Sequence, residues 1–238
     1  GRELRHTSRP LRPVVRPDRR STLRADDVQS AAAGRSSAQK KTLRASGRFR
    51  DDVVKRREAF RLAIETWVFE KIVYLDECGV NLIMTPRRAR APSGVRAVSV
   101  VPYTRSNNVS VLTAMRADGV VAWNAYDGAL NEERFLAFVQ DKLAPTLRPG
   151  DIVVLDNVRF HHAAAVEACV AARGARLEFI PPYHPELNAN EELFSFIKNA
   201  LRRQKPRTIV ELVERTKALL DGVGFTRLAA FIRHALRL

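Results

Sequence analysis

Two short apolar runs, IVYLD at residues 72–76 and IVVLD at residues 152–156, decide the fold class of this chain of 238 residues. Each run has four apolar or aromatic residues and ends in an aspartate, Asp76 or Asp156. Short runs of this kind are typical of buried strands. An unpaired carboxylate inside a protein is costly, so each aspartate has to meet solvent, a partner or a cation where its run ends. The sequence therefore predicts two core strands whose ends carry acidic groups to one edge of a sheet.

A third acid belongs to an amphipathic helix, NEELFSFIKNALRR at residues 190–203. On a helical wheel Glu191 lies roughly 110° from the centre of the apolar face, at its margin with solvent, whereas Glu192 lies roughly 150° away and faces outward. Lys198 and Arg202 fall on the same side of the wheel as Glu191. A basic helix side next to an acid suits a phosphate backbone that crosses the helix. We therefore expect Glu191 to be the acid of this helix that lies at the sheet edge.

Three carboxylates from two strands and one helix form the oxygen-rich donor set that holds Mg²⁺ in enzymes that cut phosphodiester bonds. A plainer interpretation stays open for each residue taken alone. Asp76 and Asp156 could each end a strand and turn the chain outward. The charges near Glu191 could equally belong to an ordinary surface helix.

The rest of the pattern alternates strands with helices and indicates an α/β fold. A helix from Asp52 onward would place on one face the residues Val53, Phe60, Ile64, Trp67 and Val68. Further strands are expected at residues 97–101, 109–115, 120–125 and 177–180, and further helices after Asn131 and at 163–173, 209–220 and 225–236. Asp118-Gly119 predicts a hairpin turn. Asn131 and Thr208 are the predicted helix caps.

Positive charge is concentrated at the start of the chain. The formal net charge is +15, and residues 1–50 contain 14 Lys and Arg but only 4 Asp and Glu. This excess indicates a polyanionic partner. Residues 1–38 show no helical or strand period and are predicted to be a disordered basic segment. Cys78 and Cys169 are too few for a disulfide framework, and no apolar stretch reaches the about 20 residues of a membrane helix, so we expect a cytoplasmic protein without a membrane partner.

Three segments together resemble one known family: LDECGVN at residues 75–81, VVLDNVRFHH at 153–162 and PPYHPELNANEELFSFIKNALRR at 181–203. They are similar to the catalytic domain of mariner-superfamily DDE transposases of the bacterial insertion-sequence type. The third segment resembles that family's signature of two prolines, a tyrosine, a Leu-Asn pair and an acid that precedes a basic helix. The spacing agrees as well, because 34 residues lie between Asp156 and Glu191.

The resemblance implies an RNase H-like fold, a mixed sheet flanked by helices, at residues 72–205, with a helical lead-in at 39–71 and C-terminal helices at 206–238. It implies a transposase that uses two Mg²⁺ or Mn²⁺ ions to cut DNA at transposon ends and to join these ends to target DNA. The implied catalytic and metal-binding residues are Asp76, Asp156 and Glu191, supported by Asn157, His161 and Asn188. The residues implied to bind nucleic acid are Arg87, Arg88, Arg90, Lys198, Arg202 and Arg203.

The resemblance also bears on partners. Double-stranded DNA, as transposon ends and as target, is the implied partner in the bacterial nucleoid. Family members usually carry helix-turn-helix elements upstream, and the basic segment 1–38 stands in their place, so a fragment or a change of reading frame is one hypothesis. A homodimer and a separate helix-turn-helix polypeptide stay open as further partners.

Some positions depart from the family pattern. His184 stands where the family has Ser, Ala189 where it has Pro, Asn190 where it has Ile, and Cys78 where Thr or Ser is common. We expect Asn190 to act as the N-cap that compensates for the missing proline. Two other functions stay open: an RNase H-like nuclease that cuts without strand transfer, and a decayed remnant that only binds nucleic acid.

Overall fold

The computed structural model describes residues 45–86, 88–98, 100, 108–157 and 164–237. These residues belong to one unit, Arg44–Leu238. The basic segment predicted at residues 1–38 lies outside the described residues, and so do His161 and Arg87. The expected boundaries at 38, 71 and 205 stay predictions.

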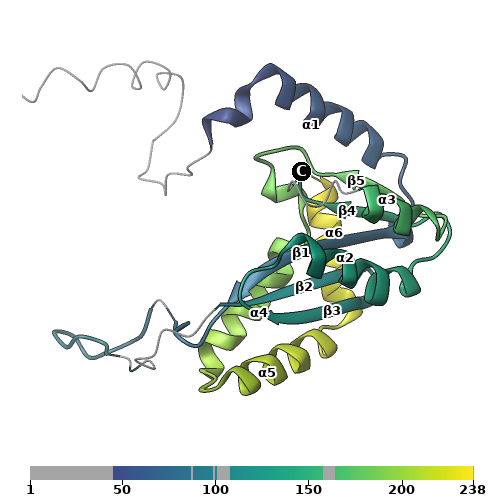
Figure 1. The fold of residues 1–238 in the computed structure, drawn as a ribbon. Coiled ribbons are helices and arrows are strands. Elements are labelled where there is room, and N and C mark those ends of the chain that lie inside the picture. Colours follow the sequence, from purple (N-terminus) through teal and green to yellow (C-terminus); the bar gives the residue numbers. More distant parts are fainter. Residues whose placement is uncertain (1–44, 87, 99, 101–107, 158–163, 238) are drawn as a thin grey trace, which may run out of the picture. The chain divides into compact units, whose positions relative to one another are not determined.

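A mixed sheet of five strands forms the centre of the described unit (Figure 1). The strands follow the order β3-β2-β1-β4-β5 across the sheet. β1 pairs antiparallel with β2 and parallel with β4, and β4 pairs parallel with β5. Their bounds are Ile72–Val80 for β1, Val109–Arg116 for β2, Gly119–Asp127 for β3, Ile152–Leu155 for β4 and Arg176–Phe179 for β5. The mixed sheet predicted from the sequence is confirmed.

Helices cover both faces of this sheet, because the inner strands β1 and β4 are apolar on both faces. Ile72 and Tyr74 of β1 pack into a core with α4, α5 and α6, whereas Val73 and Leu75 pack into a second core with α2 and α3. The helices are α1 Asp51–Ile64, α2 Glu132–Phe138, α3 Ala164–Ala171, α4 Asn190–Gln204, α5 Ile209–Asp221 and α6 Phe225–Arg237. Short 3₁₀ turns occur at Ser46–Phe49, Phe69–Lys71, Ala144–Thr146 and Pro185–Leu187, and α2 continues as a π-helical turn at Val139–Leu143.

The helix caps predicted at Asn131 and Thr208 are confirmed. The side chain of Asn131 accepts a hydrogen bond from the backbone N–H of Arg134 over 2.9 Å. Thr208 Oγ1 accepts one from the backbone N–H of Glu211 over 3.1 Å. Each cap therefore satisfies a backbone donor that the first helical turn leaves without a partner.

The expected strand at residues 97–101 and the expected length of the first helix were wrong. The strand expected at residues 97–101 does not form at the described positions 97, 98 and 100. Val98 and Val100 are 84% and 77% exposed, so no sheet partner covers these β-prone residues. The first helix ends at Ile64, before Trp67 and Val68, which lie in the connection to β1. Among the described helices, none combines the length and the apolar character that a membrane span needs.

Candidate active site

The strand register brings Asp76 and Asp156 next to each other. The parallel pairing of β1 with β4 ends at the partners Leu75 and Leu155, and each is followed directly by one of the two aspartates. Neighbouring strands lie about 4.8 Å apart, so the two acids leave this pairing as neighbours. The prediction that Asp76 ends its strand was wrong, because β1 continues to Val80 in pairing with β2 alone. Asp76 instead lies where β1 loses its partner on the β4 side.

Both carboxylate oxygens of Asp76 are held by protein donors. Oδ1 accepts a hydrogen bond from the backbone N–H of Glu77 over 2.8 Å, and Oδ2 accepts one from the side-chain amide of Asn188 over 2.7 Å. Burial raises the pKa of Asp76 well above its usual value, and the negative charges of Glu77 and Asp156 raise it further, whereas the two hydrogen bonds lower it. The site therefore fixes a carboxylate in a position where negative charge is strongly disfavoured unless a cation joins it.

Glu191 lies in the first turn of α4, which packs on the same sheet face as Asp76. Leu193 and Ile197 of α4 join the core formed by Tyr74 and Cys78, the residues on either side of Asp76 on that strand face. The prediction that Glu192 faces outward is only partly right. Glu192 is partly exposed, and its carboxylate contacts the ring of His234 in α6. Glu191 is exposed and faces the cleft described next.

The three acids line one cleft. Its volume is about 560 Å³, and Asp76, Asp156 and Glu191 all line it. Within the described residues, no three Asp, Glu, His or Cys side chains stand together as a ready-made metal site. Like charges spread apart unless a cation or a cationic side chain separates them. The fold thus places the three predicted acids around one cavity, but their carboxylates do not converge on a common point.

Of the three supporting residues predicted from the sequence, Asn157 and Asn188 lie in the described part of the chain. Asn157 lines the cleft, and Asn188 is buried between Asp76 and the start of α4. Asn188 Oδ1 accepts a hydrogen bond from the backbone N–H of Asn190 over 3.1 Å, so one amide side chain joins the strand acid to the helix. The prediction that Asn190 caps α4 was wrong. Asn190 is the first helical residue, fully buried, with its Oδ1 3.4 Å from Thr113 Oγ1.

The loop before α4 forms a wall of the cleft that the sequence did not reveal. His184 is buried, and its Nδ1 lies 3.0 Å from Glu186 Oε1, which also receives the guanidinium of Arg48. Burial lowers the pKa of His184, and the positive charge of Arg48 lowers it further against the opposing effect of Glu186. Gly47 lies so close to this loop that an added Cβ would stand 2.7 Å from Cε2 of the Tyr183 ring. The 3₁₀ turn Ser46–Phe49 is therefore fastened to the cleft wall by a charge pair and by close backbone packing.

Glu77 is a cleft residue that we did not predict. It follows Asp76 directly, lines the same cavity and adds a second negative charge beside that aspartate. Its only sequence signal is the acidic pair at residues 76–77. Residues that alternate along a strand point to opposite faces, so the strand pattern alone does not place Glu77 in the same cavity as Asp76.

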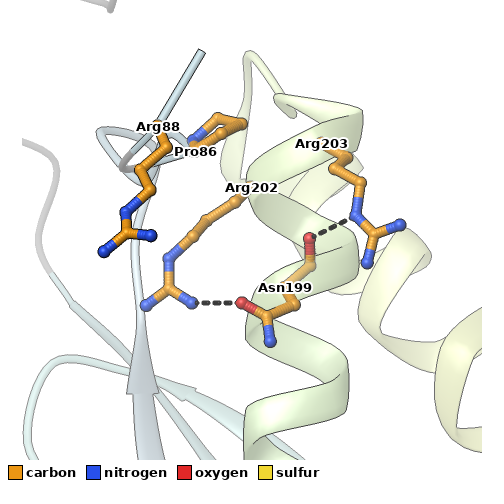
Figure 2. A pocket seen from close by; sticks show the side chains of 5 residues that line it. All are labelled: Pro86, Arg88, Asn199, Arg202 and Arg203. Carbon is orange, nitrogen blue, oxygen red and sulfur yellow. Dashed lines mark hydrogen bonds between the residues drawn. The ribbon is translucent and has the colours of Figure 1, made fainter. Parts of the chain in front are cut away.

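The residues predicted to bind nucleic acid divide into two groups. Arg88, Arg202 and Arg203 line a second hollow of about 460 Å³, together with Pro86 and Asn199 (Figure 2). Arg90 is exposed and does not line it, and the amino group of Lys198 lies 6.0 Å from the centre of the Phe194 ring. Three of the predicted residues, Arg88 from the loop after β1 and Arg202 and Arg203 from α4, thus share one hollow, and their binding of nucleic acid stays a prediction.

Comparison with known proteins bears on this site. A family model described as DDE superfamily endonuclease matches residues 71–213, a range that includes all three acids. No curated protein sequence matches the chain.

Solved structures resemble the chain in fold. The Mos1 transposase paired-end complex with left transposon end matches with a TM-score of 0.71 at 17% identity, over 84% of this chain and 64% of that chain. The Mos1 mariner paired end complex with Mn matches with a TM-score of 0.68 at 15% identity, over 86% of this chain and 65% of that chain. The catalytic domain of Mos1 mariner transposase matches with a TM-score of 0.58 at 14% identity, over 79% of this chain and 88% of that chain.

The likeness concerns the mixed sheet and its helices, which form the RNase H-like fold predicted from the sequence. The chain spans 64% of the length of the transposase in the paired-end complex. Since the family model covers more than half of the sequence and contains Asp76, Asp156 and Glu191, the chain belongs to the DDE superfamily endonucleases.

Proposed function

We propose that this chain is the catalytic part of a mariner-type DNA transposase, which cuts phosphodiester bonds at transposon ends and transfers the cut strands to target DNA. The observation that carries the proposal is the shared cleft of Asp76, Asp156 and Glu191, delivered by two parallel strands and one helix. Membership of the endonuclease family and the fold of the Mos1 complexes with transposon ends support it.

The residues of the cleft fit divalent metal ions. Carboxylate oxygens are the ligands that Mg²⁺ and Mn²⁺ prefer, and the described residues that line this cleft include no cysteine. The raised pKa of Asp76, caused first by burial and then by its acidic neighbours, indicates a surplus of negative charge that a cation would balance. We assign Asp76, Asp156 and Glu191 as the metal ligands. When bound, two ions would supply the Lewis acidity that activates a water or a 3′-hydroxyl and neutralises the leaving oxygen.

The other cleft residues position these ligands. Asn188 holds Oδ2 of Asp76 and the first backbone N–H of α4, so it sets the distance between the strand acid and the helix that carries Glu191. Asn157 follows Asp156 directly and lines the cleft, and we assign it a supporting contact with substrate phosphate. His161 keeps its proposed supporting role from the family resemblance alone.

A plasmid assay tests the proposal. Purified protein is incubated with supercoiled plasmid and Mg²⁺ or Mn²⁺, and nicked and linear products are measured on a gel. Cleavage is expected for the wild type and is expected to be lost in Asp156→Asn, but kept in Asp141→Asn, which removes the same charge from an exposed position on another helix. Cleavage that persists in Asp156→Asn would contradict the assignment.

Strand transfer needs a separate assay. A labelled duplex with free 3′-hydroxyl ends is offered with target plasmid, and covalent joining is measured on a denaturing gel. Joining supports the transposase, whereas cleavage without joining supports the nuclease alternative. The same proposal includes recognition of transposon ends, a homodimer, a separate helix-turn-helix partner, an insertion-sequence origin and a place in the nucleoid. These properties stay proposals because the chain covers only 64% of the transposase in the Mos1 paired-end complex.

A further inference from the structure

We propose that the hollow lined by Arg88, Arg202 and Arg203 is a separate site for the DNA phosphate backbone, which grips the substrate at a fixed distance from the cleft. This inference rests on the proposed function and names a contact that lies outside the catalytic acids. The first supporting observation is an excess of positive charge at this hollow. Three arginines line one hollow, and none of the described residues that line it is acidic.

The three arginines lack carboxylate partners within the described part of the chain. Other arginines of the unit form ion pairs, for example Arg116 with Asp151 and Arg215 with Glu211. Arg202 and Arg203 instead donate to Asn199, through Nη1 to Oδ1 over 3.0 Å and through Nε to the backbone oxygen over 3.3 Å (Figure 2). One asparagine thus orients two guanidinium groups and leaves their remaining N–H groups for an anion.

The position of Arg88 indicates a built site and not the chance side of a helix. Arg88 comes from the loop after β1, more than a hundred residues away in the sequence from Arg202 and Arg203 on α4. Like charges from two separate elements repel each other unless an anion separates them. The guanidinium group matches two oxygens of one phosphate, and several arginines from two elements suit the repeated phosphates of a nucleic-acid backbone.

Helix α4 sets the distance between this hollow and the cleft. Glu191 lies in the first turn of α4 and Arg202 in its last turn, on the same side of the helix. Eleven residues at about 1.5 Å each place them roughly 16 Å apart along the axis. Phosphates of one DNA strand advance about 3.4 Å per nucleotide along the duplex. About five base pairs therefore span the distance from the cleft to the hollow, so a single bound duplex can reach both.

Salt-dependent binding tests this inference. Binding of a fluorescent 30-base-pair duplex is measured between 50 and 200 mM salt without divalent ions, for the wild type and for the double variant Arg88→Gln with Arg202→Gln. The charge-matched control is Lys142→Gln with Arg173→Gln, two exposed cations near the other face of the sheet. Thermal unfolding of all three proteins confirms that they are folded.

The double variant is expected to bind about tenfold more weakly, with a dependence of log K on log salt concentration that is shallower by roughly one to two. The control is expected to keep the slope of the wild type. Equal slopes for the double variant and the control would overturn the inference.

The plasmid assay separates this result from a failure of the proposed function. The double variant is expected to raise the DNA concentration for half-maximal cleavage and to leave the maximal rate unchanged, because the hollow lies away from the acids. A wild type that cuts DNA while the double variant binds normally would refute the hollow alone. A wild type that binds through the hollow but never cuts would refute the chemistry and leave the hollow standing.

Discussion

Asn188 Nδ2 lies 2.7 Å from Asp76 Oδ2, across 112 residues of sequence, and both side chains are buried. This hydrogen bond ties the strand that carries the first acid to the segment that starts α4. Asn188→Ala removes the donor and leaves a buried carboxylate oxygen without it. We expect a loss of about 1 to 3 kcal/mol in the free energy of unfolding, measured with urea. We also expect Mn²⁺ affinity to fall about 10- to 100-fold, measured by calorimetry. Asn199→Ala, at an exposed site, is the control, and an unchanged Mn²⁺ affinity in Asn188→Ala would contradict the role.

The crowding of acids predicts an effect of Asp156→Asn on stability. In the absence of divalent ions, this variant removes a negative charge beside Asp76, so its melting temperature at pH 7 is expected to rise by a few degrees. Mn²⁺ should raise the melting temperature of the wild type, because a ligand that binds only the folded state stabilises it, and should leave that of the variant nearly unchanged. Calorimetric scans with Mn²⁺ and with EDTA measure both effects. An equal response of the two proteins to Mn²⁺ would exclude Asp156 as a ligand.

A buried ion pair predicts an asymmetric response to mutation. Arg116 Nη2 lies 2.6 Å from Asp151 Oδ2, and both residues are almost fully buried. Asp151→Ala leaves a buried guanidinium without its partner and is expected to cost about 3 to 5 kcal/mol of unfolding free energy. The double change Arg116→Met with Asp151→Leu removes both charges and should recover much of this loss. Urea unfolding of the three proteins measures the difference, and a double variant as unstable as the single one would contradict the explanation.

The charge pair on the cleft wall predicts a pH dependence of stability. Burial raises the pKa of Glu186, but hydrogen bonds from Arg48 and His184 outweigh it and lower the pKa to about 2, from a usual 4.5. A lowered carboxyl pKa stabilises the folded state above about pH 4.5, and this contribution is lost as the pH falls toward about 2. We expect Glu186→Gln to cost roughly 1 to 3 kcal/mol at pH 6 and little near pH 2. The measurement is urea unfolding at both pH values. Glu214→Gln, an exposed acid of α5, should show no such difference.

Local patterns predicted most of the sheet and the three acids. The apolar runs that contain Val73 and Val153 identify the central strands, because both faces of these strands are covered and every position is apolar. The helical wheel located Glu191 because α4 has one clear apolar side. These patterns depend on a few neighbouring residues and are therefore visible in the sequence.

Pairings between distant segments were not visible. Nothing local distinguishes Val98, which is exposed, from Val111, which is buried in β2, because both are β-prone residues in similar runs. The bond between Arg116 and Asp151 and the packing of Gly47 on Tyr183 likewise depend on segments that meet only in the fold. The continuation of β1 beyond Asp76 depends on β2, which follows after a long connection.

That continuation of β1 gives the three acids unequal freedom. Asp76 is held inside a strand with both oxygens engaged, whereas Asp156 follows the last residue of β4 and Glu191 lies in the first turn of a helix. In the metal centre that we propose, a cation of larger radius would therefore have to be accommodated by the two acids at element ends. Exchange of Mg²⁺ for the larger Ca²⁺ would displace Asp156 and Glu191 and leave Asp76 in place.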